Sequence, residues 1–558
     1  MRAVDAVMEC LKAEGVKHVF GIPGGANLPT YDALYDAGLR HVQCRHEQGA
    51  GHAAEGYAKA SGQVGVALAT SGPGATNLVT AIADAMMDSV PTVFITGQVR
   101  TDLLGTDGFQ EADVTGITMP IVKHSIMIQD PLEIPKAIRE AFHVARTGRP
   151  GPVLVDIPQD LSRADIPYEP VDSVHLPGYQ PTKEGNTKQI RLAAKALANS
   201  RRPVIYAGGG VVNAEASPEL VDLAMSDRFP VTCTLMGLGA FPAPHDQWLG
   251  MLGMHGTRSA NYAMDEADLI CCIGARFDDR ITGKLSEFAP RAKFIHIDVD
   301  PAEISKNVPA HIPIVGDAKQ ILPKLCAEYR ALETDAARLD GWWERIRGWR
   351  EKHPLGYEDS EGSEIKPQYM IEALYEATGG DAIVTSDVGQ HQMWVAQYFH
   401  FDGPRKWINS GGLGTMGFGL PSAMGAKVAM PDEQVVCVAG DGSIIMNVQE
   451  LATCVTESIA VKVFIMNNGY LGMVRQWQEL FWDRRYSAVD MGSSPDWVKL
   501  AEAFGATGMR VDDKAELPGM MKNALETEGP VICDVRVTPE ENCYPMIPAG
   551  QAARDMVG

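Results

Sequence analysis

The sequence predicts an α/β protein with three doubly wound parallel-sheet domains, of which the first and third are related. Short apolar runs alternate with helical patterns and Gly/Pro turns along the chain, two polar segments interrupt that rhythm, and a long internal repeat links the two ends. At 558 residues the chain is long enough for several domains with separate cores.

The first unit is predicted to span residues 1–165. Its apolar runs at 64–69 and 92–96 are short and lie between helical patterns, which is typical of strands joined by helical crossovers. Met1 leads almost directly into a helical pattern that begins at Val4, so we expect no signal or transit peptide before this domain.

Two further units are predicted downstream. A polar, proline-bearing stretch at 163–187 is expected to be a linker to a second α/β unit at 188–325. A charged, tryptophan-containing segment at 340–367 is expected to be a second connector. The third unit is predicted at 366–540, followed by a short tail at 541–558.

Charge and cysteine usage narrow the class of protein. The formal net charge of −22 argues against partners such as nucleic acids and anionic membranes. No apolar run reaches the roughly 18 residues that a membrane-spanning helix needs. The ten cysteines are scattered without a C-x-x-C pair, and Cys271 and Cys272 lie in an apolar stretch, which favours buried thiols. These features predict a reduced, cytoplasmic enzyme.

The internal repeat relates the first and third units. A shift of 368 positions places Gly51 on Gly419 and the glycine turn 72–74 on the turn 440–442. Both copies run from a glycine through a small-residue helix, an apolar strand and a glycine turn to a second helix and strand. The period is too long for a solenoid, so it predicts two related domains that flank an unrelated one.

The two copies differ at the edge where open parallel sheets bind ligands. Pro73 in the first copy is replaced by Asp441 in the third, and residues 96–97 are replaced by an Asn-Asn pair that includes Asn468, 27 residues after Asp441. A carboxylate and an amide oxygen suit Mg²⁺, whose octahedron phosphate oxygens and water can complete. A helix that starts after the glycine turn would direct its backbone N–H groups at the phosphate. The alternative is an aspartate and an asparagine that only shape turns.

The segment from Asp441 to Asn468 resembles the cofactor motif of thiamin-diphosphate enzymes. The resemblance implies that Asp441, Asn468 and the backbone carbonyl of Tyr470 hold Mg²⁺ against the diphosphate. It implies further that Gly414 accepts a hydrogen bond from the cofactor's amino group and that Met416 supports its bent shape, although Met416 could also be a core residue. The implied contacts to thiamin diphosphate are Val388, Gly389, Gln390, His391, Gly414, Met416, Gly442 and Ser443.

Glu47 stands at the start of a small-residue helix in the first unit. From the residues alone it is better explained as a charge that complements the helix dipole. The resemblance instead implies that Glu47 bonds the aminopyrimidine ring of the cofactor and promotes loss of the thiazolium C2 proton. In this family the first domain of one subunit faces the third domain of its partner, which implies a homodimer or homotetramer with active sites at the subunit interface. We assign no acid/base role to His46, His52 or His391.

The middle unit has only a weak dinucleotide signature of its own. Gly208-Gly209-Gly210 follows a predicted strand, but Asn213 replaces the last glycine of G-x-G-x-x-G. As a whole the unit resembles the FAD-binding middle domain of acetolactate synthases, in which the flavin has no net redox role. The FAD contacts implied are Gly208, Gly209, Gly210, Met254, His255, Gly256, Thr257, Gly274, Arg276, Asp278, Arg280, Asp298 and Asp317.

Three segments, at 105–111, 277–280 and 472–478, favour the catalytic large subunits of acetolactate synthases over their relatives. Arg280 could pair its planar guanidinium with the carboxylate of a second keto acid, or form only a surface ion pair. Trp477 could shape the acceptor pocket or fill a core. Arg100 and Trp482 depart from the family pattern. The implied catalytic and substrate-facing residues are Gly25, Glu47, Phe109, Gln110, Arg280, Met473 and Trp477.

The resemblance implies an enzyme that decarboxylates pyruvate and transfers the hydroxyethyl group to another 2-keto acid. Transfer to pyruvate gives 2-acetolactate and transfer to 2-ketobutyrate gives 2-aceto-2-hydroxybutyrate, at the first common step of branched-chain amino acid biosynthesis. A regulatory small subunit is a further implied partner. The acceptor preference and the choice between dimer and tetramer stay open.

Three alternative functions are considered. A flavin-dependent pyruvate oxidase shares the folds and both cofactors. Glyoxylate carboligase lacks the glutamate, so Glu47 argues against it. A non-catalytic nucleotide-binding or regulatory protein could have kept the fold, but Glu47, Asp441 and Asn468 would then have no reason to occur together.

Overall fold

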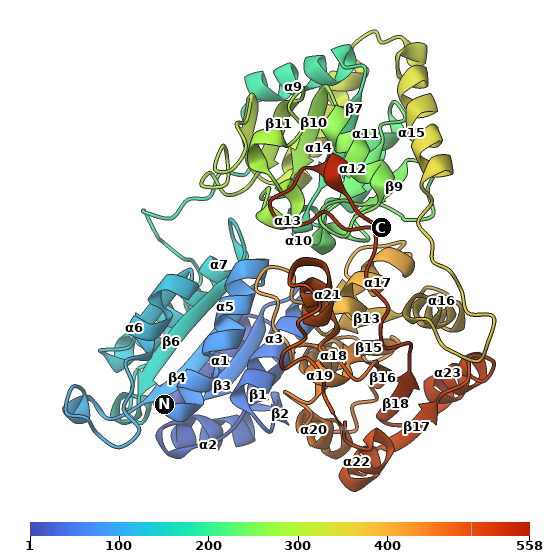
Figure 1. Ribbon diagram of the computed structural model, residues 1–558. Coiled ribbons are helices and arrows are strands. Elements are labelled where there is room, and N and C mark those ends of the chain that lie inside the picture. The colour runs from blue at the N-terminus through green and yellow to red at the C-terminus, as the bar shows by residue number, and fades with distance from the viewer. Residues whose placement is uncertain (493) are drawn as a thin grey trace.

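The computed structural model describes residues 1–492 and 494–558. The described chain contains three six-stranded sheets in which all strand pairs are parallel. In Figure 1 they form three lobes, with the first and third sheets side by side below the second. The predicted three-domain α/β class is confirmed. None of the described helices is long and apolar enough to cross a membrane.

The first sheet has the strand order β2-β1-β3-β4-β6-β5. Alternate residues of its strands enter two different cores: Val66 and Leu68 pack with α1 and α7, whereas Ala67 and Ala69 pack with α3. The sheet is therefore doubly wound. Its elements are α1 (Ala3–Ala13), β1 (His18–Gly21), α2 (Leu28–Ala37), β2 (Arg40–Gln43), α3 (Glu47–Ser61), β3 (Gly65–Ala69), α4 (Pro73–Asn77), α5 (Val79–Asp88), β4 (Thr92–Gln98), α6 (Val114–Thr118), β5 (His124–Met127), α7 (Ile134–Arg146), β6 (Pro152–Pro158) and α8 (Gln159–Ser162).

The third sheet repeats this order as β14-β13-β15-β16-β18-β17, so the first and third domains share one topology, as the internal repeat predicts. Its elements are α16 (Pro367–Thr378), β13 (Ile383–Ser386), α17 (Gln390–Tyr398), β14 (Trp407–Ile408), α18 (Gly419–Ala429), β15 (Val435–Gly440), α19 (Asp441–Ile444), α20 (Glu450–Thr456), β16 (Lys462–Asn467), α21 (Gly472–Phe481), α22 (Trp497–Phe504), β17 (Thr507–Val511), α23 (Leu517–Glu526) and β18 (Val531–Arg536).

The middle sheet has a different order, β12-β11-β10-β7-β8-β9, which is that of dinucleotide-binding folds. The order in which strands are added to the sheet reverses between the parallel neighbours β7 and β10. Such folds bind their ligand at this switch point. Its elements are α9 (Thr187–Asn199), β7 (Pro203–Ala207), α10 (Gly209–Asn213), α11 (Ser217–Met225), β8 (Val231–Cys233), β9 (Trp248–Met251), α12 (Arg258–Glu266), β10 (Leu269–Ile273), α13 (Asp279–Thr282), β11 (Lys293–Asp298), β12 (Ile312–Val315), α14 (Ala318–Arg330) and α15 (Asp340–Lys352).

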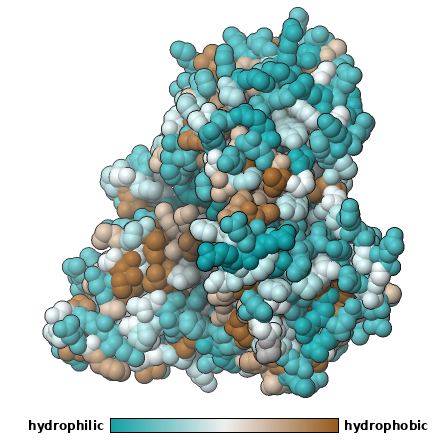
Figure 2. Space-filling model, in the orientation of Figure 1, coloured by the Kyte–Doolittle hydropathy of each residue, from teal (hydrophilic) through white to brown (hydrophobic). Residues whose placement is uncertain are grey.

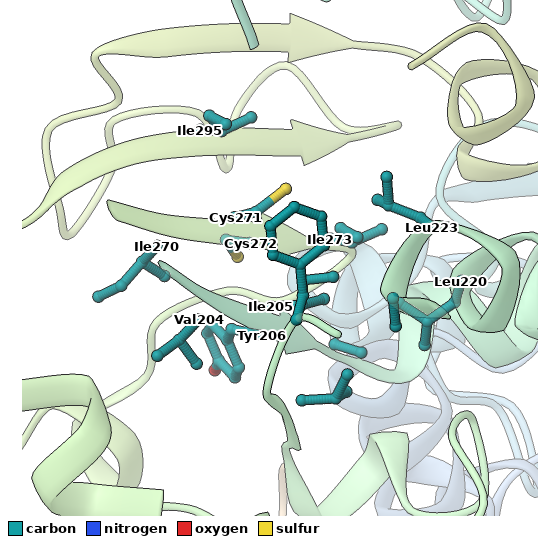
Figure 3. Close-up of a cluster of buried hydrophobic side chains, with 14 of the residues drawn as sticks. Val204, Ile205, Tyr206, Leu220, Leu223, Ile270, Cys271, Cys272, Ile273 and Ile295 are labelled. Atoms are coloured by element: carbon teal, nitrogen blue, oxygen red, sulfur yellow. The ribbon is translucent and has the colours of Figure 1, made fainter. Parts of the chain in front are cut away.

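The core of the middle domain holds the adjacent cysteines. Figure 3 shows Cys271 and Cys272 on β10 among the side chains of Ile205, Ile270 and Ile273. Both thiols are free and fully buried, and burial raises the pKa of Cys271 to about 12. They are packing residues rather than reactive groups.

The segment expected to be a second connector begins with helix α15, which belongs to the middle domain. Trp342 and Trp343 are buried in that domain's core, and their indole groups donate hydrogen bonds to the carbonyls of Pro203 (3.1 Å) and Arg228 (2.8 Å). The prediction of a connector was wrong over residues 340–352. Charged residues dominate the sequence of this helix, so its few apolar residues did not predict a buried face.

The first and third domains share one hydrophobic core, in which α3 packs directly on α18. A side chain at Gly425 would collide with the backbone of Ala53, and one at Gly56 would collide with the backbone of Ser422. The two helices can approach this closely because glycine stands at both contact points.

Gly425→Ala should therefore lower the free energy of unfolding by about 1–3 kcal/mol, since two backbones must move apart. Thermal or denaturant unfolding measures this loss. Gly519→Ala is the matched control, because Gly519 is an exposed helical glycine of α23 with open space around it. Alanine there should be neutral or stabilise by up to about 1 kcal/mol. Equal effects of the two substitutions would contradict the packing argument.

Candidate active site

A cavity of about 890 Å³ opens where the three domains meet. Its walls come mainly from the middle and third domains, and 87–89 and 146–150 contribute from the first. Most of the predicted cofactor residues line it. They are Gly209, Gly210, Met254, His255, Gly274, Arg276, Asp278, Arg280, Asp298, Asp317, Val388, Gly389, Gln390, His391, Gly414, Met416, Gly442, Ser443, Asn468 and Tyr470, with Met473 and Trp477 beside them.

Several predicted residues lie behind the cavity wall. Gly208 packs against the backbone of Gly274 at the switch point of the middle sheet, and Gly256 packs against Leu252. The hydroxyl of Thr257 caps α12, where it accepts from the amide of Ala260 (3.1 Å) and donates to a backbone carbonyl. In the described chain these three residues shape the loops that form the wall.

Asp441 and Asn468 follow adjacent strands, since β15 pairs with β16 up to Gly440 and Met466. Asp441 is 1% exposed. One of its oxygens accepts from the Ser494 hydroxyl (3.1 Å), and the other has no hydrogen-bond partner among the described residues. Burial raises the pKa of Asp441 to about 6. A buried carboxylate with a free oxygen, beside an amide oxygen, fits a hard cation.

Buried Asp387 holds two cofactor-facing segments of the third domain together. Its carboxylate accepts from the amides of Val388 (2.8 Å), Gly417 (2.8 Å) and Gly419 (3.1 Å). The amide of Val388 lies at the start of the predicted diphosphate turn. The amides of Gly417 and Gly419 directly follow the segment that carries Gly414 and Met416. No sequence motif marks Asp387 for this task.

Two carboxylates of the first domain hold the same segment from the other side. Asp84 accepts from the Ser410 hydroxyl (2.7 Å), which in turn accepts from the amide of Thr415 (2.8 Å). Asp88 accepts from the amides of Gly411 (3.1 Å) and Gly412 (2.7 Å). The loop is therefore fixed by contacts between domains.

The buried histidines near the site are neutral bases. Burial lowers the pKa of His52 to about 4 and that of His391 to about 3. The side chain of His46 caps α3 by accepting from the amide of Gln48 (3.1 Å). These observations agree with the absence of an assigned acid/base role for them.

The residues of the first domain that were predicted to face the substrate follow strands of its own sheet at their carboxyl ends. Glu47 is the first residue of α3 and accepts from the side-chain amide of Asn77 (2.9 Å). Gln110 lies over the turn at Gly72, and Phe109 is 88% exposed. Among the described residues that line the cavity, none is Gly25, Glu47, Phe109 or Gln110. Within one chain these four residues are separated from the cavity.

Two residues of α21, Met473 and Trp477, line the cavity one helical turn apart. The intervening Gln476 is fully buried and accepts from the amide of Cys543 (2.8 Å), which ties the helix to the C-terminal tail. Arg280 faces the cavity from the middle domain; its only described ion pair is a 3.9 Å contact with exposed Asp279, and such a contact contributes little.

Large apolar side chains are exposed on both outer domains. In the first domain they are Leu103, Phe109, Ile117 and Met119, and in the third domain they are Leu413, Met446, Val474, Phe481 and Trp482. Figure 2 shows hydrophobic residues gathered on the face of the first domain near α5 and α6. Patches of this kind mark interaction surfaces.

Comparison with protein families identifies the class that this fold and site define. The chain matches the N-terminal TPP binding domain of thiamine pyrophosphate enzymes over residues 1–117, their central domain over 190–325 and their C-terminal TPP binding domain over 387–535. It is a thiamine pyrophosphate enzyme.

Individual relatives are more specific. The chain is 50% identical to an acetolactate synthase of Mycobacterium bovis, with 99% of this chain and 92% of the relative covered. It is 50% identical to the acetolactate synthase isozyme 3 large subunit of Escherichia coli (98% and 96% covered) and 48% identical to the large subunit of Haemophilus influenzae (100% and 98% covered). The chain belongs to the acetolactate synthase large-subunit family.

Proposed function

We propose that this enzyme decarboxylates pyruvate and joins the two-carbon fragment to a second 2-keto acid, giving 2-acetolactate from pyruvate or 2-aceto-2-hydroxybutyrate from 2-ketobutyrate. The observation that carries the proposal is the single cavity in which Asn468, Met473, Trp477 and Arg280 converge, in a chain about half identical to acetolactate synthases. The product would enter branched-chain amino acid biosynthesis.

Two groups besides thiamin diphosphate are proposed to bind here. Mg²⁺ would bind at Asp441, Asn468 and the Tyr470 carbonyl, because Asp441 has a buried carboxylate oxygen without a hydrogen-bond partner among the described residues and follows the strand adjacent to that of Asn468. FAD would bind in the middle-domain part of the cavity, where Gly210 and Gly274 meet at the switch point of the sheet. The flavin is proposed to have no net redox role.

Thiamin diphosphate bound here would supply a nucleophilic carbon and an acceptor for the electrons released on decarboxylation. Glu47 would hold and return a proton at the aminopyrimidine nitrogen. Arg280 would bind the carboxylate of the acceptor through its planar fork. Trp477 and Met473 would enclose the acceptor's alkyl group and exclude water that could protonate the reactive carbon. Phe109, Gln110 and Gly25 would complete the substrate side.

The active site is proposed to form between two copies of the chain. Glu47 does not line the cavity of its own chain, and the first and third domains, which carry Glu47 and Asp441, both expose large apolar side chains. A symmetric dimer that places each Glu47 against the partner's third domain would cover apolar side chains of both domains and complete two sites. Since several relatives are named large subunits, a smaller regulatory chain is a further proposed partner. We also propose a cytoplasmic location.

Product analysis tests the function directly. The purified protein is incubated with pyruvate, Mg²⁺, thiamin diphosphate and FAD, with and without 2-ketobutyrate. We expect acid treatment of the pyruvate product to yield acetoin, and a second product to appear with 2-ketobutyrate. Acetate or acetyl phosphate with bleaching of the flavin under anaerobic conditions would instead establish a pyruvate oxidase.

Trp477→Leu should change acceptor choice more than turnover. The indole lines the part of the cavity assigned to the acceptor, so a smaller side chain should weaken the preference for 2-ketobutyrate over pyruvate by about tenfold, or about 1.4 kcal/mol. The ratio of the two products in mixed-substrate incubations measures the effect. Leu192→Ala, at an exposed position on α9 that does not line the cavity, is the control. An unchanged ratio in Trp477→Leu would refute the assignment.

A further inference from the structure

Glu450 is a buried carboxylate to which the proposed reaction assigns no task. It is the first residue of α20 in the third domain and is fully buried. Its side chain nevertheless contacts the first domain. Oε1 accepts from the backbone amides of Arg45 (3.0 Å) and His46 (2.9 Å), and Oε2 accepts from the hydroxyl of Thr453 (2.8 Å).

The two amides immediately precede Glu47, so the carboxylate sits against the start of α3. Gly49 permits this approach, because a Cβ atom there would lie 2.5 Å from Oε1 of Glu450. A carboxylate is stabilised at the positive end of a helix, and one removed from water needs fixed donors to be tolerated. Glu450 therefore holds the backbone just before Glu47 in one conformation.

We propose that Glu450 is a positioning residue for Glu47, fixing the backbone from which the Glu47 side chain reaches the aminopyrimidine of the bound cofactor. The inference rests on the proposed function. The side chain of Glu47 is held separately by Asn77 (2.9 Å), so backbone and side chain are restrained from two sides. In the proposed dimer, Glu47 serves the site that contains the partner's third domain. Glu450 would therefore affect that site, and not the site to which its own third domain contributes.

Glu450→Gln keeps the shape of the side chain and removes its charge. In the full-length protein with thiamin diphosphate and Mg²⁺, we expect exchange of the cofactor's C2 proton with deuterium to slow by about tenfold to a hundredfold, since small misplacements of a catalytic group have effects of this size. The dissociation constant for thiamin diphosphate, followed by tryptophan fluorescence, should change by less than about twofold because the cofactor-binding residues are untouched.

Two further measurements separate positioning from general damage. In the cofactor-free protein, amide hydrogen exchange at Arg45 and His46 should become faster in Glu450→Gln. Thr453→Val, which removes a donor to Glu450, should slow C2 exchange to a smaller extent, whereas Thr453→Ser keeps the hydroxyl and should behave like the wild type.

A double-mutant cycle decides whether Glu450 acts through Glu47. Glu47→Gln should slow C2 exchange on its own, and adding Glu450→Gln should slow it no further. A second multiplicative loss would overturn the inference, as would weaker cofactor binding with normal C2 exchange. If Glu47→Gln itself exchanges at the wild-type rate, the proposed function of Glu47 fails. A slow Glu47→Gln with an unaffected Glu450→Gln would overturn only the role of Glu450.

Discussion

Glu47→Gln should lower the turnover of pyruvate by about 10²–10⁴-fold, the range that a well-placed acid/base group contributes. Glutamine has the shape of glutamate but cannot cycle a proton at the ring nitrogen of the cofactor. Turnover is measured as acetolactate formed at saturating thiamin diphosphate and Mg²⁺, and C2 proton exchange is measured on the same samples.

The fold should survive this substitution. Glu47 is only half-buried and its side chain accepts one hydrogen bond, from Asn77, so the free energy of unfolding should change by less than about 1.5 kcal/mol. Thermal unfolding and the affinity for thiamin diphosphate are the controls. Near-normal turnover by the folded variant would contradict the assignment of Glu47.

Asp441→Asn should weaken Mg²⁺ binding by at least about a hundredfold. Loss of a residue that only hydrogen-bonds to a metal ligand already weakens metal binding by about 10–100-fold, and loss of the ligand itself should have a larger effect. The substitution removes the negative charge of a buried carboxylate whose only hydrogen bond among the described residues comes from Ser494. The affinity for thiamin diphosphate should fall with it, because the cation links the diphosphate to the protein. Titration of each ligand at fixed concentrations of the other measures both effects.

Asp432→Asn is the matched control for this prediction. Asp432 is an exposed carboxylate that precedes the same strand, β15, and its loss should leave Mg²⁺ binding unchanged. If Asp441→Asn bound Mg²⁺ and thiamin diphosphate like the wild type, the metal site would lie elsewhere.

The part of the site that lies on strand ends could be predicted from the sequence. Asp441 and Asn468 each stand two residues after the end of an apolar run, and the repeat shows that the first domain lacks both oxygens. Parallel topology then brings the two residues to one edge, and the pairing of β15 with β16 does so in the structure. This inference needs only local patterns and the direction of the strands.

The residues that hold the cofactor-facing loops could not be predicted in this way. Asp84 and Ser410 are 326 positions apart, and Arg45 and Glu450 are 405 apart. Their contacts exist because α3 packs on α18 across a glycine-lined interface. An aspartate or glutamate in a helix carries no local signal of a partner in another domain. Ser494, which binds Asp441, is hidden in the same way within a loop.

Helix α15 was missed for a different reason. Its sequence is dominated by charged residues, while Trp342 and Trp343 supply the buried surface and bond to backbone carbonyls of the middle domain. Trp342, Trp343 and Ile346 are the buried residues of the helix, where a longer apolar stripe would normally be expected. The helix is amphipathic, but only a few residues form its apolar face.

Complementation between variants tests the central claim, that Glu47 of one subunit serves the metal-bound cofactor of the other. Glu47→Gln and Asp441→Asn chains are inactive alone on this account. In a dimer containing one of each, one site carries both defects and the other carries neither. Dissociation and reassociation of an equal mixture should therefore restore up to about a quarter of the wild-type activity. A mixture that stays as inactive as its components, although mixed dimers form, would place Glu47 and Asp441 in the same chain's site and contradict the account.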